Sequence, residues 1–369
     1  MGMHMINAKK TESAVLKIFI LLICTIVPNN AFSDNSEDDS TCIKVMQLNI
    51  WLGASQVANG FTGLIDIIEK VNPDILILCE LHNEIISSIL NDKYTDSSLR
   101  ITDALKKRNL TYYGRNDGST VGVISKYKIN DFKIIPTPKN NFMAKAIINI
   151  KGINFAVYSL QLDNKYYGPY LPRGYSSTDW QKIPKPITNV QEITRQNNLS
   201  TRDETIGIFL DDADIETEKQ NEIIMGGDFN EPSFQDWQEN TKYLNDHNGV
   251  VINWYCSTVL RDYKFIDTFR AKYPNVVSNP GFTYPSANKD VTVGKLGYCS
   301  EKDERDRIDF IYYRASNKIK LVDSQIVGPP FSVYCGQIYV NDSEDVIIAP
   351  KSVWPSDHNG NVTTLRLKQ

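Results

Sequence analysis

The sequence predicts one strand-rich α/β domain, and three observations support this fold class. A β-α-β unit opens the chain after its first 42 residues, and apolar or alternating segments of strand length continue to the C-terminus. No internal repeat, low-complexity linker or charge block divides that span. The chain has 369 residues, 41% of them hydrophobic and 23% charged, which is ordinary for a globular protein. This length would allow two domains, but the uninterrupted pattern favours one.

The first 33 residues have the features of an export signal. Lys9, Lys10 and Lys17 precede an apolar run at 18–27, and Ala31-Phe32-Ser33 offers small residues at a cleavage site. The run is about half as long as a bilayer-spanning helix, so we expect no permanent membrane span. A short buried helix is the alternative. An export signal at 1–33 predicts a secreted or periplasmic protein.

An acidic segment at 34–42 follows, and we expect it to be the disordered N-terminus of the mature protein. The formal net charge of the whole chain is −4 and its pI is about 5.7. Both values argue against a surface basic enough to hold nucleic acid through phosphate contacts alone. They do not exclude a nuclease, because a local basic patch or a bound cation can supply the positive field.

The opening β-α-β unit is predicted residue by residue. In the first strand, 43–51, Met46, Leu48 and Ile50 alternate on one face. The helix that follows carries Leu64, Ile67, Ile68 and Val71 at positions i, i+3, i+4 and i+7. Asn72-Pro73-Asp74 ends this helix, and the second strand, 75–81, is apolar on both faces until Glu80. Such a strand is typical of a sheet interior that is covered on both sides.

The rest of the chain predicts further strands, one helical segment and one long loop. Residues 190–213 form a helical pattern, and the polar, aromatic stretch 163–189 reads as a long ordered loop. Lys151-Gly152 marks a hairpin between two neighbouring strands. The predicted strands are 121–125, 142–150, 153–160, 222–225, 308–313, 319–327 and 361–367.

Six cysteines are present, and Cys24 would leave with the export signal. None of the remaining five forms a CxxC pair, so a zinc ribbon has no support. Cys79 lies within an apolar strand and is expected to be free and buried. An oxidising compartment would permit one or two disulfides among the other four, whose pairing the sequence leaves open: Cys42, Cys256, Cys299 and Cys335.

Five short segments place acidic, amide or imidazole side chains on or just after apolar strands: 47–51, 79–80, 226–230, 307–310 and 356–358. Strand ends are where a rigid scaffold displays functional groups, although a single Asp or Asn there is commonly only a turn former. In Gly226-Gly227-Asp228-Phe229-Asn230, the paired glycines permit close backbone approach. Asp228 and Asn230 stand two apart, so in extended backbone they share one face. A carboxylate and an amide side by side suit holding a water and a phosphoryl oxygen together.

These segments, in this order, resemble the motifs of the endonuclease/exonuclease/phosphatase superfamily. The residues that carry the resemblance are Asn49, Glu80, Asp228, Asn230, Asp309, Asp357 and His358. The superfamily includes DNase I-like nucleases, abasic-site endonucleases, inositol-polyphosphate 5-phosphatases and bacterial sphingomyelinases. The resemblance implies a four-layer α/β sandwich, with two mixed β-sheets packed face to face between helical layers. It assigns residues 43–369 to one catalytic domain.

The resemblance also implies a metal site. Glu80 is similar to the principal metal carboxylate of the family, with Asn49 completing the site directly or through water. Asp357 resembles an additional acid on the metal side, or one that orients water. Oxygen ligands of this kind favour Mg²⁺, or Mn²⁺, over zinc. Such an ion neutralises phosphoryl oxygens and lowers the pKa of a bound water.

Four further residues are assigned to the reacting groups by the same resemblance. Asp228 resembles the residue that orients and helps to deprotonate the attacking water. Asn230 resembles the amide that holds a phosphate oxygen. His358 resembles the histidine beside the scissile phosphate, held by a carboxylate that matches Asp309. A carboxylate partner fixes the histidine tautomer and favours the charged imidazolium.

One position departs from the family pattern. Many relatives carry a second histidine where this chain has Gln161, which can donate a hydrogen bond to a phosphate oxygen but cannot carry charge. Arg173 and Tyr170, in the long loop, could compensate as phosphate-binding groups, as could Tyr166 and Tyr167. An arginine can grip phosphate with two hydrogen bonds, or it can pack structurally. The loop's tyrosines and Trp180 could stack on bases or a lipid glycerol face, or pack on one another.

Taken together, these features predict a secreted divalent-metal-dependent phosphoesterase that hydrolyses phosphodiesters of nucleic acid or of a phospholipid head group. Two alternatives stay open. One is a phosphomonoesterase acting on sugar or inositol phosphates, for which Lys106-Lys107-Arg108 is the one basic cluster found. The other is a catalytically silent binding module with the same fold. Serine-hydrolase and P-loop motifs are absent from the sequence. We expect a monomer, and no protein partner can be inferred.

Overall fold

The computed structural model describes residues 41–82, 96–340 and 342–368. The expected export signal, residues 1–33, and residues 34–40 of the acidic segment lie outside the described residues. The last two residues of that segment, Thr41 and Cys42, are not disordered but begin the first strand. Within the described ranges, no helix is both long and apolar enough to cross a membrane.

The first of two large sheets has seven strands in the order β14-β11-β15-β1-β2-β4-β3. It is mixed, because β1 pairs in parallel with β2 and antiparallel with β15. Its strands are β14 (Ile347–Ile348), β11 (Ile319–Val327), β15 (Gly360–Leu367), β1 (Thr41–Asn49), β2 (Ile75–Cys79), β4 (Gly122–Ser125) and β3 (Tyr113–Arg115).

The second sheet has six strands in the order β5-β6-β7-β8-β10-β9. It is also mixed, because β7 and β8 are parallel whereas β8 and β10 are antiparallel. Its strands are β5 (Ile129–Ile135), β6 (Phe142–Ile150), β7 (Ile153–Gln161), β8 (Glu222–Asp228), β10 (Asp309–Arg314) and β9 (Phe265–Asp267). A separate hairpin is formed by β12 (Phe331–Tyr334) and β13 (Gln337–Val340).

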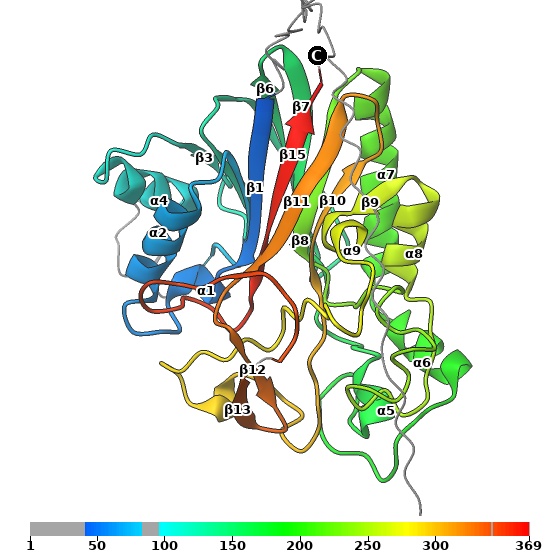
Figure 1. Ribbon diagram of the computed structural model, residues 1–369. Coiled ribbons are helices and arrows are strands. Elements are labelled where there is room, and N and C mark those ends of the chain that lie inside the picture. The colour runs from blue at the N-terminus through cyan, green and yellow to red at the C-terminus, as the bar shows by residue number, and fades with distance from the viewer. Residues whose placement is uncertain (1–40, 83–95, 341, 369) are drawn as a thin grey trace, which may run out of the picture. The chain divides into compact units, whose positions relative to one another are not determined.

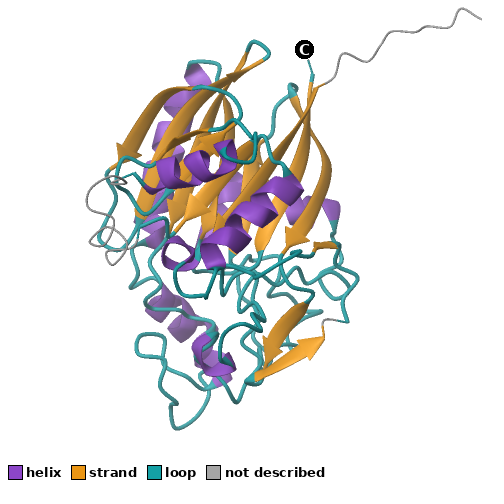
Figure 2. Ribbon diagram, turned by 90° about the vertical axis from the view of Figure 1, so that its left-hand side faces the viewer, coloured by secondary structure: helices purple, strands orange, loops and turns teal. Residues whose placement is uncertain are grey.

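Helices cover the outer face of each sheet, as Figures 1 and 2 show. On the first sheet lie α2 (Gly60–Val71) and α4 (Ser97–Lys106), and on the second lie α7 (Arg202–Glu218) and α8 (Tyr255–Asp262). The remaining helical segments are α1 (Trp51–Ala54), α5 (Tyr170–Arg173), α6 (Val190–Asn197), α9 (Thr268–Lys272) and the 3₁₀ turn η1 (Val293–Lys295).

Three buried clusters separate the four layers. In β1, Val45 points to the cluster between the two sheets, whereas Met46 and Leu48 pack on the helix side. In β2, Ile77 faces the other sheet and Leu78 faces the helices. Burying such a side chain fully stabilises the fold by about 1.5–3 kcal/mol, so strands that are apolar on both faces belong between two covered layers. The four-layer sandwich implied by the sequence is therefore confirmed.

Local signals fix the boundaries of the opening unit. Helix α2 ends at Val71. Its C-cap, Asn72, makes the last helical hydrogen bond, to the Ile68 carbonyl, and then turns the chain with a left-handed backbone (φ 49°). Pro73 follows and cannot continue a helix. At the other sheet, a Cβ at Gly227 would lie 1.9 Å from the Leu160 carbonyl oxygen, so only glycine permits β8 to lie this close to β7.

Most predicted strands match the structure within a few residues, and β6 and β11 match at both ends. The predicted helix 190–213 is two helices, α6 and α7, interrupted at 198–201. The loop 163–189 contains the short helix α5. The sequence analysis did not find the strands β3, β5, β9, β12, β13 and β14 or the helices α1, α4, α8 and α9.

The five cysteines expected in the mature chain are all free in the structure. Cys79 is buried, as predicted, and its thiol donates to the Leu160 carbonyl at 2.9 Å. The disulfides that the sequence analysis allowed among the other four do not form: Cys42, Cys256, Cys299 and Cys335.

Candidate active site

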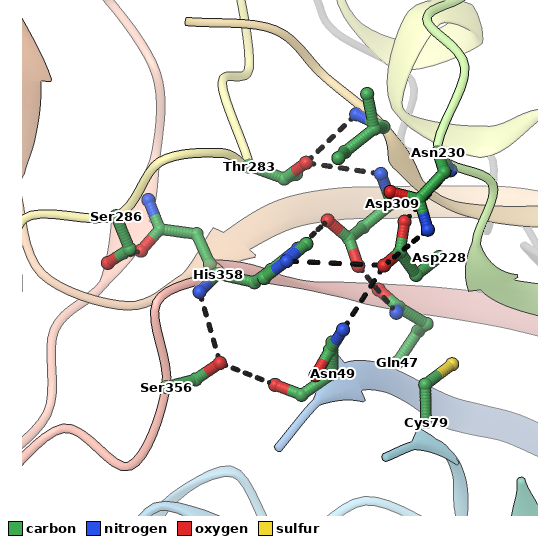
Figure 3. Close-up of polar contacts among 12 residues, drawn as sticks. Gln47, Asn49, Cys79, Asp228, Asn230, Thr283, Ser286, Asp309, Ser356 and His358 are labelled. Atoms are coloured by element: carbon green, nitrogen blue, oxygen red, sulfur yellow. Dashed lines mark hydrogen bonds and ion pairs between the residues drawn. The ribbon is translucent and has the colours of Figure 1, made fainter. Parts of the chain in front are cut away.

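The polar segments predicted from the sequence meet where two pairs of parallel strands end. Asn49 is in register with Cys79 across β1 and β2, and Gln161 is in register with Asp228 across β7 and β8. Because the two sheets pack face to face, all four strand ends lie at one edge of the sandwich. Figure 3 shows the side chains that converge there.

A buried histidine–carboxylate pair forms the centre of the site. His358 Nδ1 lies 2.9 Å from Asp309 Oδ2, and its Nε2 lies 4.0 Å from Asp228 Oδ2. Burial alone would lower the pKa of His358, but the charges of Asp309 and Asp228 and the hydrogen bond to Asp309 outweigh it, so this pKa is well above its ordinary value. The two neighbouring carboxylates therefore favour the charged form of the ring. Asp309 fixes its orientation, as predicted.

The backbone around His358 is anchored to the first sheet. Ser356 Oγ donates to the Asn49 carbonyl oxygen at 2.7 Å and accepts the His358 N–H at 3.0 Å (Figure 3). Trp354 Nε1 donates to the His358 carbonyl oxygen at 2.8 Å. Tyr284 packs its ring 4.8 Å from the imidazole, centroid to centroid. These contacts hold the imidazole in one position with respect to the end of β1.

Three residues that the sequence analysis did not single out hold Asp309 in place. Gln47 Nε2 donates to Asp309 Oδ1 at 3.0 Å, and Asn361 Nδ2 donates to Gln47 Oε1 at 3.2 Å and to the Asp309 carbonyl oxygen at 2.9 Å. Thr283 Oγ1 accepts the Asp309 N–H at 3.1 Å. Gln47 stands two residues before Asn49 on the same strand face, and that spacing was the signal that could have identified it.

Asp228 faces the imidazolium from the end of β8. Its Oδ2 accepts hydrogen bonds from Asn49 Nδ2 at 3.1 Å and Asn230 Nδ2 at 3.3 Å, and its Oδ1 accepts the Asn230 N–H at 2.9 Å. Burial, with further contributions from Asp309 and Glu80 and against the opposing charge of His358, raises the pKa of Asp228 to about 7. A carboxyl group with this pKa can accept a proton from water near neutral pH.

Asn230 lines the same cavity as Asp228, as expected for an amide that contacts substrate. Its Nδ2 donates to the Leu162 carbonyl oxygen at 2.9 Å as well as to Asp228. Its backbone is left-handed, with φ 45°, a conformation that asparagine tolerates better than most residues. This turn directs the amide into the cavity immediately after β8.

Glu80 follows the last residue of β2. Its backbone is strained, and its carboxylate accepts hydrogen bonds from three donors. Its φ is 56°, a left-handed conformation that costs a glutamate about 1–3 kcal/mol. Its Oε1 accepts from Asn49 Nδ2 and Gln161 Nε2, both at 3.1 Å, and its Oε2 accepts the Leu52 N–H at 3.0 Å. Strain of this kind persists where surrounding contacts over-determine the conformation, and here they aim the carboxylate at the cavity.

The amide side chains of Asn49 and Gln161 have partners within the protein. Asn49 Oδ1 accepts the Trp51 N–H at 3.0 Å, so its amide group turns nitrogen, not oxygen, toward Glu80 and Asp228. Asn49 therefore aligns the two carboxylates in this structure, and its contact with a metal, directly or through water, stays a prediction. Gln161 lines the cavity, its Nε2 donates to Glu80, and its Oε1 lies 3.5 Å from Thr120 Oγ1, so a contact with phosphate stays a prediction.

Asp357 lines the cavity beside these groups. Its carbonyl oxygen accepts the Ser286 N–H at 2.7 Å, which fixes the backbone. Its side-chain Oδ1 is buried and has no hydrogen-bond partner among the described residues. Burial, with a contribution from Glu80 and against the opposing charge of His358, raises the pKa of Asp357 to about 7. An orphaned buried oxygen next to other acids is the arrangement expected where a cation completes a site.

The cavity has a volume of about 400 Å³ and is lined by residues from both sheets and the long loop. Tyr170 lines it, but its hydroxyl donates to Glu304 Oε2 at 2.8 Å and points away from the cavity. Arg173 is fully buried, donates to Asp306 Oδ2 at 2.6 Å and does not line the cavity. The prediction that Arg173 binds phosphate is therefore wrong. Arg173 instead forms a buried ion pair with Asp306, which is a structural role.

The donor set fits a hard divalent cation. Among the described residues, Asp228, Asp309 and His358 bring possible ligand atoms within 4.8 Å of one another. His358 Nδ1, however, is already engaged with Asp309 Oδ2 at 2.9 Å. The oxygens available to a cation at the cavity wall are those of Glu80, Asp228 and Asp357. Carboxylate oxygens without thiolate or imidazole partners suit Mg²⁺ or Mn²⁺.

The structure thus gathers most of the predicted site and leaves one residue out. Arg173 is the residue that the fold directs elsewhere. The residues that it brings together at one edge are Asn49, Glu80, Gln161, Asp228, Asn230, Asp309, Asp357 and His358.

Comparisons with known proteins show the family to which the chain belongs. The sequence model of the Endonuclease/Exonuclease/phosphatase family matches residues 46–358. An uncharacterized Caenorhabditis elegans protein is 26% identical over 352 residues, covering 93% of this chain and 96% of that protein. Among solved structures, D. rerio TDP2 complexed with single strand DNA product has 14% identity and a TM-score of 0.47, with 88% of this chain and 99% of that chain covered. The human Nocturnin catalytic domain with bound sulfate has 15% identity and a TM-score of 0.47, with 89% and 97% covered.

Proposed function

Because this chain belongs to the endonuclease/exonuclease/phosphatase family, whose members hydrolyse phosphate esters, we propose that it is an exported, divalent-metal-dependent phosphodiesterase. The observation that carries the proposal is the facing pair at the base of the cavity. His358 Nε2 and Asp228 Oδ2 lie 4.0 Å apart and both residues line the cavity, so the two side chains can act side by side on one phosphate bound there.

The residues of the chain divide the reaction between them. Asp228, with a pKa raised to about 7, orients a water and accepts its proton. The water oxygen attacks phosphorus, one P–O ester bond breaks, and the products are a phosphate monoester and an alcohol. His358 Nε2 donates a hydrogen bond to a phosphoryl oxygen, and the positive charge of the ring stabilises the charge that develops there. Asn230 holds a second phosphoryl oxygen.

A divalent cation, Mg²⁺ or Mn²⁺, would be held by Glu80 and Asp357, with Asn49 aligning Glu80 beside Asp228. When bound, it supplies charge neutralisation at the phosphate and a more acidic water. The orphaned Oδ1 of Asp357 supports this assignment. Without a cation, three acids at one wall would repel the phosphodiester anion.

The two alternatives have weaker support. A phosphomonoester carries about one more negative charge than a diester, and the described residues that line the cavity include no lysine or arginine to balance it. A silent binding module would have no need for the strained backbone of Glu80 or for a buried imidazolium, both of which are costly to keep.

Export is part of the proposal and rests on the sequence alone. The charged, apolar and small-residue regions of 1–33 support cleavage near Ser33 and release to the periplasm or the medium. We also propose that the exported protein acts as a monomer. N-terminal sequencing of protein recovered from the medium or periplasm tests the first point, and light scattering of that protein tests the second. A retained residue 1 or a stable dimer would contradict them.

The hydrolysis of bis-p-nitrophenyl phosphate tests the activity. We expect turnover with Mg²⁺ or Mn²⁺ that stops with a chelator and returns with added metal. His358→Ala and Asp228→Asn should each lower kcat by at least about 100-fold, as loss of a charged clamp or general base does. Asp117→Asn, an exposed acid outside the cavity, is the matched control and should leave kcat unchanged. Unchanged turnover in the first two variants, with correct folding, would refute the assignment.

A further inference from the structure

One side of the active cavity is built by the long loop 163–189 and not by the strands. Four side chains of the loop line the cavity: Asn164, Tyr167, Tyr170 and Trp180. The loop includes α5, which lies beyond the strand ends in Figure 1. Within this fully described loop, Tyr175 and Lys182 form a β-bridge with each other, and no strand of either sheet lies in it. Side-chain contacts therefore hold this wall against the strands that carry the reacting groups.

The carboxylate of Asp306 supplies one set of these contacts. Asp306 is 3% exposed and lies three residues before Asp309. Its Oδ2 accepts hydrogen bonds from the Tyr167 hydroxyl at 2.8 Å and from Arg173 Nη1 at 2.6 Å. Its Oδ1 accepts one from Trp237 Nε1 at 3.1 Å. Two of these three donors belong to the loop, so one buried carboxylate connects the loop to the segment that enters β10.

The backbone of Asp306 connects it to the surroundings of the catalytic histidine. Asp306 and Tyr284 form a β-bridge. The Asp306 N–H donates to the Tyr284 carbonyl oxygen at 2.9 Å, and the Tyr284 N–H donates to the Asp306 carbonyl oxygen at 3.0 Å. Tyr284 lines the cavity and packs its ring 4.8 Å from the imidazole of His358, centroid to centroid. Asp306 therefore lies between the loop wall and the segment that packs on His358.

Glu304, two residues earlier, holds the neighbouring ring in the same way. Its Oε2 accepts the Tyr170 hydroxyl at 2.8 Å and the Tyr298 N–H at 3.0 Å, and both tyrosines line the cavity. The rings of Tyr167 and Tyr170 are in edge-to-face contact, with centroids 4.8 Å apart. Two carboxylates, those of Glu304 and Asp306, therefore anchor two adjoining rings of the wall by their hydroxyl groups.

A purely structural role would not require the hydrogen bond between Tyr167 and Asp306. A buried ion pair such as that of Asp306 with Arg173 often stabilises a fold no better than apolar residues of similar volume. A buried tyrosine hydroxyl is also tolerated without a partner in this protein. Tyr312 is 2% exposed, and its hydroxyl has no hydrogen-bond partner among the described residues. The Tyr167 hydroxyl is instead bound to a charged acceptor, which makes a strong and directional contact and indicates that the direction of this ring matters.

We propose that Asp306 is a positioning residue for phosphodiester hydrolysis, an inference that rests on the function proposed above. Its carboxylate holds the ring of Tyr167 in place relative to His358, and this ring orients the ester group that does not leave. Asp306 does not line the active cavity but a separate cavity of about 280 Å³, so it acts on the substrate through Tyr167. Esters with a bulky remaining group should depend on this contact, and esters with a small remaining group should not.

Two esters with the same leaving group test this dependence at saturating Mg²⁺. Bis-p-nitrophenyl phosphate keeps a p-nitrophenyl group after hydrolysis, whereas methyl p-nitrophenyl phosphate keeps only a methyl group. Tyr167→Phe removes the hydroxyl and keeps the ring. We expect this variant to lower kcat/KM for the aryl ester by about 5- to 10-fold, mainly through KM, and for the methyl ester by less than about 2-fold, because one charge-assisted hydrogen bond is lost.

Further variants connect the effect to Asp306. Asp306→Asn keeps the size of the side chain and removes its charge, so it should shift the ratio of the two kcat/KM values in the same direction and by at least as much. The double variant should shift this ratio no further than Asp306→Asn alone, because both substitutions break the same contact. Tyr312→Phe is the matched control, since it removes a buried hydroxyl without a partner among the described residues, and it should leave the ratio unchanged. Urea unfolding checks the fold of each variant, and Tyr167→Phe decides the test if Asp306→Asn does not fold.

The results separate this inference from the function on which it rests. An equal loss for both esters in Tyr167→Phe, or no loss for either, would overturn the positioning role of Asp306 while the phosphodiesterase function stands. Additive effects in the double variant would overturn it as well. If the wild-type protein hydrolyses neither ester with Mg²⁺ or Mn²⁺, the proposed function fails, and the inference fails with it.

Discussion

Gln161 provides the sharpest test of how this site works, because sequence and structure give its amide different roles. By sequence it stands where relatives have a histidine beside the phosphate, whereas in the structure its Nε2 donates to Glu80 at 3.1 Å. The replacement Gln161→Leu removes this donor and keeps a similar volume. If the geometry is correct, the variant weakens metal binding by loosening Glu80, and the chemical step at saturating metal changes little.

The size of the effect follows from the contact. Glu80 would keep two donors, Asn49 and the Leu52 N–H, and lose the third. A hydrogen bond to a charged group contributes about 1.5–3 kcal/mol. Loss of a group that orients a metal ligand typically lowers metal affinity by about 10- to 100-fold, which corresponds to about 1.4–2.8 kcal/mol. The hydrogen-bond energy and the effect on a metal ligand therefore both predict that the apparent Kd of Mg²⁺ rises by about 10- to 100-fold.

The assay is a Mg²⁺ titration of bis-p-nitrophenyl phosphate hydrolysis at fixed substrate, with the apparent Kd and the maximal rate fitted separately. Gln325→Leu is the matched control, since Gln325 is a half-buried residue of β11 outside the cavity lining. A normal Kd for Mg²⁺ with a maximal rate lowered 10-fold or more would refute the reasoning. That result would indicate that Gln161 contacts the phosphate and does not orient Glu80.

Three further predictions concern stability, each measured by urea unfolding at pH 7.5 unless stated. Gly227→Ala should destabilise the protein by about 3 kcal/mol or more, because the added Cβ would meet the backbone of β7. Gly207→Ala has open space around it and should stabilise helix α7 by about 0.5–1 kcal/mol. Equal effects of the two substitutions on stability would contradict this packing. Arg173→Met should cost about 3 kcal/mol by leaving its buried carboxylate partner unpaired; a stability within 1 kcal/mol of wild type would show that the ion pair is dispensable. Burial, helped by the charge of Arg173, lowers the pKa of His247 to about 2, so the stability given by its neutral ring is present above about pH 6.5 and is lost as the pH falls. Lowering the pH from 7.5 to 5.5 should therefore reduce the free energy of unfolding of wild type by about 1.4 kcal/mol more than that of His247→Phe. An identical pH dependence of the two proteins would contradict a buried neutral histidine.

The parts of the fold that the sequence predicted are those whose signal is local. β2 is apolar at every position, and all five of its residues are buried, so its place between two covered layers follows from composition. β5 was not found because its exposed and buried residues do not alternate, and a bulge between Ile129 and Asp131 shifts its register. Its pairing with β6, not its own pattern, makes it a strand.

The same distinction separates the site residues that were predicted correctly from those that were not. The motif around Asp228 is predictable because the turn that presents the carboxylate and the amide of Asn230 lies within three residues. The orientation of Arg173 depends on Asp306, 133 residues away, and that of Gln161 depends on Glu80, 81 residues away. A long polar side chain can find hydrogen-bond partners in more than one direction. Its direction in the fold is determined by partners that lie far away in the sequence.

Gln47 shows what a positional rule can still recover. It shares a strand face with Asn49, and a fully buried amide on the face that carries the site must find partners there, because an unsatisfied buried polar group costs about 1–3 kcal/mol. Its partners are Asp309 and Asn361, both supplied by strands far along the chain. The alternation of side chains along a strand therefore predicts that Gln47 belongs to the site. That Gln47 supports Asp309, the carboxylate paired with His358, follows only from the packing of the two sheets.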